Sequence, residues 1–123
     1  MIRHLVVAAL AASIAMGMEP GAQAHAFLDN ATPRVGAVVK VPPNTIRIQF
    51  TQPIEPAFSH IRLFAPDGKP VNTGPAATDP SDQTQLIAPI IGALPPGRYE
   101  VRWDVLSVDT HRTNGHFPFT YQP

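Results

Sequence analysis

Two segments near the C-terminus alternate between apolar and polar residues, and this pattern limits the fold more than any other feature of the sequence. Every second position is apolar in residues 98–106, and residues 117–121 repeat the period; the apolar members are Tyr99, Val101, Trp103, Val105, Phe117, Phe119 and Tyr121. A period of two is typical of a half-buried β-strand, whose alternate side chains face the core. The pattern therefore predicts two strands, each with one apolar face.

The rest of the sequence favours further short strands over helices. Residues 44–50 alternate in the same way, and we expect strands over 58–64 and 85–88, a short first strand within 25–33 and a hairpin arm over 69–72. Residues 73–84, rich in Gly, Pro, Asp, Ser and Thr, predict a loop. Fifteen prolines are spread along the chain, and proline interrupts helix interiors and central strands alike. Roughly seven strands separated by turns predict an all-β fold, an antiparallel sandwich or Greek-key barrel.

The first 24 residues have the pattern of a secretory signal peptide. A short basic start precedes an unbroken apolar run over residues 5–16, and Ala22-Gln23-Ala24 is a small-residue cleavage signal. The run is shorter than the roughly 20 residues of a membrane span. We therefore expect cleavage after Ala24, export to the periplasm, and a single mature domain over residues 25–123 of about 100 residues.

Composition restricts the partners and the metal chemistry. The chain has nine basic and nine acidic residues, a balance that gives no sign of a nucleic-acid partner. It contains no cysteine, which excludes disulfides, blue-copper centres and cysteine zinc sites. Its three methionines, Met1, Met16 and Met18, all precede the predicted cleavage point. Any metal held by the mature chain must therefore be bound through nitrogen and oxygen.

Three residues form a candidate metal site of that kind. Asp109 and His111 are two positions apart, so in extended backbone their side chains project to the same side, about 6.6 Å apart. Cleavage after Ala24 would make His25 the first residue, with an α-amine and an imidazole that chelate together. Three nitrogens and one oxygen in a tetragonal arrangement suit Cu(II), which heads the affinity order for such ligands. The expected metal set is therefore His25, Asp109 and His111, holding one Cu(II) ion.

Each of these residues also has an ordinary interpretation. His25 could follow the cleavage point by chance, and Asp109 and His111 could be a turn residue and a surface loop residue. His116 is a candidate auxiliary ligand, although its spacing from His111 favours a surface position. Ser107 lies near Asp109 and His111, but a hydrolase triad is defined by geometry that a sequence does not show.

The mature sequence resembles the CopC family of periplasmic copper-resistance proteins. The resemblance covers essentially the whole mature chain and is carried most specifically by the N-terminal His25 and by the run Tyr99-x-Val-x-Trp-x-Val-x-Ser-x-Asp-x-His111, with Gly115 and residues 117–119. It implies a small Greek-key sandwich of cupredoxin-like, immunoglobulin-like topology. It also implies a Cu(II) site made by the amine and imidazole of His25 with Asp109 and His111. Thr110 stands where the family usually has glycine, and the methionine-rich Cu(I) site of some members has no counterpart here.

The resemblance implies a copper-binding protein, not an enzyme, that sequesters copper or passes it to an inner-membrane partner of the CopD type. We expect a monomer. One alternative is a copper oxidase of the lytic polysaccharide monooxygenase type, which also uses an N-terminal histidine but pairs it with a second histidine and an open axial position. The other is a metal-free secreted sandwich that acts as an interaction module.

Overall fold

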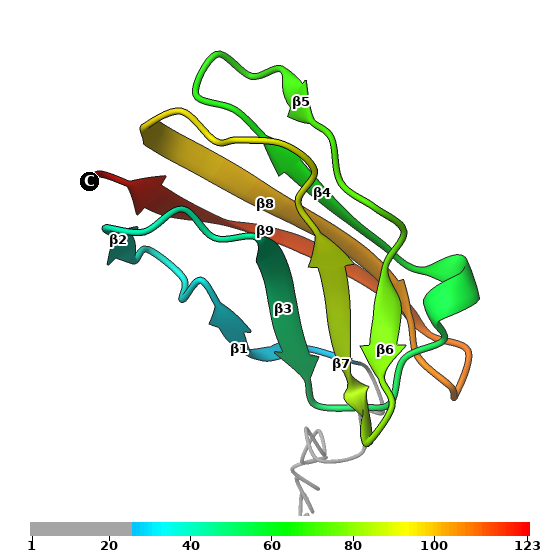
Figure 1. Cartoon of the computed structure of the whole chain (residues 1–123). Helices are drawn as coiled ribbons and strands as arrows, with labels where there is room; N and C mark the ends of the chain where they lie inside the picture. The colour runs from blue at the N-terminus through cyan, green and yellow to red at the C-terminus, as the bar shows by residue number, and fades with distance from the viewer. Residues whose placement is uncertain (1–25) are drawn as a thin grey trace, which may run out of the picture.

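The computed structural model describes residues 26–123, which form a single two-layered β-sandwich (Figure 1). One sheet has four strands in the order β1-β3-β7-β6, and the other has five in the order β2-β9-β8-β4-β5. The strands are β1 (Leu28–Thr32), β2 (Val38–Val39), β3 (Thr45–Phe50), β4 (His60–Phe64), β5 (Pro70–Val71), β6 (Ala77–Asp79), β7 (Asp82–Pro89), β8 (Gly97–Leu106) and β9 (Arg112–Tyr121). The chain crosses repeatedly between the sheets, which confirms the Greek-key sandwich expected from the sequence.

The apolar faces predicted by the alternation meet in the core between the sheets. Tyr99, Val101, Trp103 and Val105 of β8 are buried, as are Ile46, Ile48 and Phe50 of β3. The edge of the Trp103 ring packs against Phe50, with the ring centroids 5.2 Å apart. Trp103 also lies against Gly115 on β9, where a Cβ atom would come within 2.5 Å of the indole. Gly115 is therefore required for the close fit of the indole against β9.

Two features differ from the sequence prediction. The polar segment 73–84 is not a continuous loop, because it contains β6 and the start of β7. The two strands are joined by a tight turn in which Asp79 accepts hydrogen bonds from the backbone and hydroxyl of Ser81. The polar residues that form this turn led the sequence analysis to predict a loop over the whole segment. In addition, β2 pairs with β9 in parallel, whereas the other strand pairs are antiparallel.

One end of the sandwich brings together segments that are distant in the sequence. The turn between β8 and β9, orange in Figure 1, lies beside the connection from β3 to the short 3-10 helix η2 (Pro56–Phe58). Ile54 forms a bridge with Ser107, and the amide of Val108 donates to the carbonyl of Pro53 at 3.1 Å. No helix among residues 26–123 has the length and apolar character that a membrane crossing requires.

Candidate metal centre

The turn from Ser107 to His111 carries both residues of the predicted Asp-x-His pair. It is closed by two backbone hydrogen bonds, from Ser107 N–H to the His111 carbonyl and from Thr110 N–H to the Ser107 carbonyl, each 2.9 Å. Thr110 has a φ of +71°, in the left-handed region that favours glycine. The sequence argument assumed an extended backbone between Asp109 and His111. The structure instead has a left-handed turn at Thr110 between them.

Asp109 and His111 nevertheless converge. Oδ2 of Asp109 lies 3.4 Å from Nδ1 of His111. The other carboxylate oxygen, Oδ1, accepts a hydrogen bond from the hydroxyl of Ser107, which is fully buried. Ser107 is itself held by its backbone bridge to Ile54. The hydroxyl of the buried Ser107 thus fixes the orientation of the Asp109 carboxylate.

The carboxylate of Asp109 has an unusual electrostatic environment. Its Oδ2 atom is shielded from solvent and, among residues 26–123, accepts no hydrogen bond of regular geometry, with the His111 ring 3.4 Å away as its nearest polar neighbour. Buried polar atoms without a partner are rare in proteins and call for an explanation such as a bound ion. The hydrogen bond from Ser107, reinforced by contact with His111, lowers the pKa of Asp109 despite an opposing effect of desolvation. The carboxylate is therefore ionised at neutral pH and presents an oxygen that can accept a cation.

The start of the described chain is attached beside this turn. Ala26 is completely buried, and its carbonyl accepts a hydrogen bond of 2.6 Å from the hydroxyl of Thr113, two residues after His111. The next residue, Phe27, exchanges hydrogen bonds with Thr51: its amide donates to Oγ1 at 3.0 Å, and its carbonyl accepts from the Thr51 amide at 2.9 Å. Residues 26 and 27 are thus fixed against β9 and the end of β3.

The structure brings two of the three predicted ligands together, and the third lies outside the described residues. That third ligand is His25, and the signal peptide predicted over residues 1–24 also lies there. Within residues 26–123, no group of three or more His, Asp or Glu side chains has the arrangement of a metal site. Asp109 and His111 are thus two of the three residues that the sequence analysis predicts as ligands, and their side chains lie close together.

The two other histidines among residues 26–123 lie on the outer face of the five-stranded sheet. His116 on β9 is exposed, with Nδ1 3.2 Å from Oε1 of Glu100. His60 on β4 is exposed opposite Asp104, as expected for the polar face of a strand. Arg112 forms an ion pair of 2.9 Å with Asp104.

Sequence reasoning missed the contacts that Ser107 and Thr113 make beside this turn. Ser107 was considered only as a hydrolase nucleophile, whereas its hydroxyl orients Asp109. Thr113 was not singled out, although it follows His111 by two positions and precedes the buried Phe117 by four, a spacing that places it on the inner face of β9. This alternation was the sequence signal that could have identified Thr113 as an inward-facing residue.

Comparison with known proteins assigns the family. The CopC domain matches residues 28–122 of the chain. The chain belongs to the CopC family. This confirms the family resemblance that the sequence analysis found.

Individual relatives match most of the chain. It is 39% identical over 101 residues to protein YobA of Escherichia coli K12, covering 82% of each chain, and 27% identical over 119 residues to copper resistance protein C of Escherichia coli, covering 92% and 94%. It is 26% identical over 97 residues to copper transport protein CutJ of Bacillus subtilis, covering 79% of this chain but 18% of CutJ. The crystal structure of CopC from Methylosinus trichosporium OB3b superposes with a TM-score of 0.75 at 32% identity, covering 80% of this chain and 95% of that one.

Proposed function

We propose that this chain is a periplasmic Cu(II)-binding protein of copper homeostasis and resistance. One ion would be held by the α-amine and imidazole of His25, the carboxylate of Asp109 and the imidazole of His111. Copper is the cargo of such a protein and not a resident catalytic cofactor, so we propose binding and transfer as its function, without an enzymatic step.

The observation that carries this proposal is the carboxylate of Asp109. Its Oδ2 atom is buried without a hydrogen bond of regular geometry and lies 3.4 Å from the His111 ring. The Ser107 hydroxyl already occupies Oδ1, so Oδ2 is the carboxylate oxygen that remains to bind a cation. An ionised oxygen beside an imidazole is an incomplete site for a cation that accepts both nitrogen and oxygen ligands, as Cu(II) does.

Attachment of the N-terminal segment supports the participation of His25. Ala26 is bonded directly to residue 25 and is fixed to Thr113 on β9. The strand that continues from His111 therefore anchors the neighbour of His25.

The transport relative supports a membrane partner of the CopD type. In CutJ, a copper transport protein, the matching region makes up 18% of the length, so the domain is joined covalently to a much larger protein. A separate exported domain, released by cleavage after Ala24, would serve the same purpose by docking with a partner in the inner membrane and handing on its ion.

Copper titration of matched variants tests this proposal. We expect the chain that begins at His25 to bind one Cu(II) per molecule, and D109A or H111A to weaken binding by at least tenfold, because each removes a ligand. The matched control is H116A, which removes an imidazole from the outer sheet face and should leave binding unchanged. Equal binding by wild type, D109A and H111A would contradict the proposal, as would a loss in H116A as large as that in H111A.

A further inference from the structure

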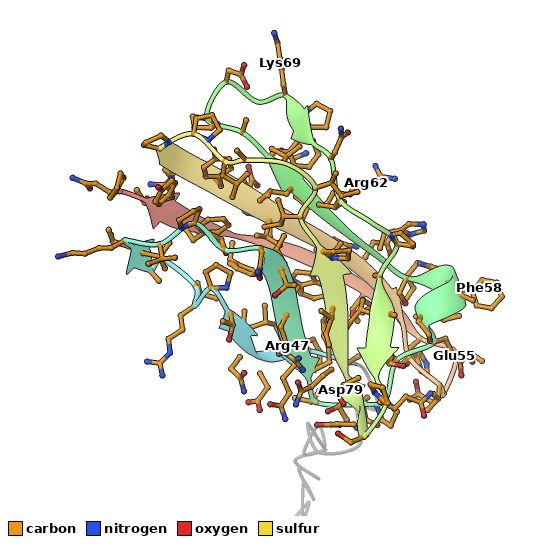
Figure 2. All side chains as sticks on the ribbon, viewed as in Figure 1. Arg47, Glu55, Phe58, Arg62, Lys69 and Asp79 are labelled. Carbon is orange, nitrogen blue, oxygen red and sulfur yellow. The ribbon has the colours of Figure 1, made fainter. Side chains whose placement is uncertain are left out.

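Two arginines and a histidine form a row across the outer face of the five-stranded sheet. Arg62 on β4 is the register partner of Arg102 on β8, and Arg102 is the partner of His116 on β9. All three are exposed, and Arg62 is labelled in Figure 2. Like charges directly opposite one another destabilise a sheet, so this row needs a compensating anion.

The protein itself compensates this row incompletely. The guanidinium of Arg102 lies 4.4 Å from the centre of the Phe64 ring, and its Nε atom is 3.4 Å from Oε1 of Glu100. The same oxygen of Glu100 also contacts His116, so one carboxylate serves both side chains. Among residues 26–123, no ion pair is formed by Arg62. The charged residues of β4, β8 and β9 are four arginines against two carboxylates, whereas the whole chain is neutral. Positive charge is therefore concentrated on this face.

The row borders a hollow of about 310 Å³. Besides Arg62, Arg102 and His116, its lining includes the ring of Phe64, the amide of Asn114, the carboxylate of Asp104, and Trp103, whose ring lies in the core beneath this face. Trp103 is the chain's only tryptophan and is 8% exposed. The hollow therefore combines cationic groups, a hydrogen-bonding amide and an apolar floor.

We propose that this hollow is a docking site for an acidic polypeptide segment of a partner protein. Arg62 and Arg102 supply the charge that recognises the carboxylates, His116 adds a hydrogen-bonding imidazole, and the Phe64 ring accepts the aliphatic stems of acidic side chains.

The spacing and the charge pattern favour a polypeptide over other anions. Neighbouring strands are about 4.8 Å apart, so the row spans nearly 10 Å, more than one phosphate or carboxylate can bridge. Alternate side chains of an extended peptide are about 6.6 Å apart, a spacing at which two carboxylates reach along the row. Glu100 and Asp104 lie within the same face and would repel a uniformly anionic membrane, whereas a peptide can place its charges between them.

The site would hold a partner near the Asp-x-His turn. His116 is five residues from His111 along one strand, or about 17 Å in extended backbone. A protein docked on the cationic row would thus cover the same strands that end at that turn. The inference does not depend on copper binding, so it can be tested on the metal-free protein.

Tryptophan fluorescence provides the test, because Trp103 lines the hollow. We expect a hexaglutamate peptide to change the emission saturably, with an affinity that falls as salt is added. The double variant R62S/R102S should weaken binding about tenfold. The control R34S/K40S removes the same charge from a segment outside the hollow and should bind within twofold of wild type. Circular dichroism verifies that both variants fold.

Other outcomes would overturn the proposal. Equal weakening in both double variants would show attraction to net charge alone. Inorganic phosphate that binds as tightly as the peptide would show a small-anion site. A response to phosphatidylglycerol vesicles without a response to the peptide would show a membrane surface, and no saturable change with any probe would remove the site altogether.

Discussion

Replacing Thr113 with valine should loosen the N-terminal segment selectively. The substitution keeps the shape of the side chain but removes the hydroxyl that donates to the Ala26 carbonyl. Because Ala26 is completely buried, its carbonyl would lose its hydrogen bond without regaining one from water. An unsatisfied buried group of this kind costs about 1–3 kcal/mol.

The structure allows the size of the effect to be worked out. Three hydrogen bonds to other described residues hold residues 26 and 27, at about 1 kcal/mol each, and the buried Ala26 methyl adds about 0.8 kcal/mol. Local opening of the segment in the wild type therefore costs about 4 kcal/mol, which leaves it open about 0.1% of the time. A loss of about 2 kcal/mol in T113V raises the open fraction to a few per cent, so the segment still docks but opens some 30-fold more often.

Native-state hydrogen exchange measures this opening directly. The amides of Phe27 and Thr51 donate hydrogen bonds that join the N-terminal segment to the end of β3. Their exchange should accelerate between about 5- and 150-fold in T113V. T113S keeps the hydroxyl and should match the wild type. T120V, the same substitution elsewhere on β9, controls for the loss of a threonine. Identical exchange at Phe27 and Thr51 in T113V and T120V would refute the view that Thr113 anchors the segment.

Three further predictions concern the turn and the acid stability of the sandwich. S107A removes the hydrogen bond to Asp109 and should raise the pKa of that carboxyl, which NMR titration measures. It should also weaken Cu(II) binding about 10- to 100-fold, as loss of a ligand-orienting partner commonly does. An unchanged pKa would contradict the role assigned to Ser107. T110G relieves the left-handed φ of +71° and should stabilise the fold by about 1 kcal/mol in chemical denaturation, whereas a loss of stability would show that the threonine side chain compensates for its conformation. The hydrogen bond from Arg47 holds the pKa of Asp79 at about 2, below the ordinary value of 3.8 (Figure 2), so the contribution of the ionised carboxylate to stability is complete above pH 4 and is lost as the pH falls toward 2. The free energy of unfolding of D79N should therefore change less with pH across this window than that of the wild type. An equal pH dependence of the two proteins would refute the assignment.

The layers of the fold could be predicted because alternation records burial directly. The residues at alternate positions of β8 face the core, and so do those of β3. Strands β6 and β7 were missed in part because their residues are mostly polar and half-exposed. Their pairing is set by a turn with Asp79 and Ser81 and by the neighbouring strands, so it depends on contacts that a local pattern does not contain.

The sequence predicted that Asp109 and His111 lie close together, but it did not predict the geometry of the turn that joins them. Asp109 and His111 do converge, yet through a left-handed turn at Thr110 instead of an extended strand. The same turn explains why a glycine is usual at that position in the family, since glycine adopts positive φ without strain. The contributions of Ser107 and Thr113 arise from contacts across the fold, because each meets a partner that only the packed sandwich brings near.

The central claim is that the terminal amine and imidazole of His25 complete the site begun by Asp109 and His111. Cu(II) electron paramagnetic resonance on two preparations tests it most directly, one beginning at His25 and one carrying a single additional residue before it. We predict a tetragonal, nitrogen-rich spectrum from the first, lost or reshaped in the second because the extension converts the chelating amine into an amide. Identical spectra, or no stoichiometric binding by either preparation, would contradict the account.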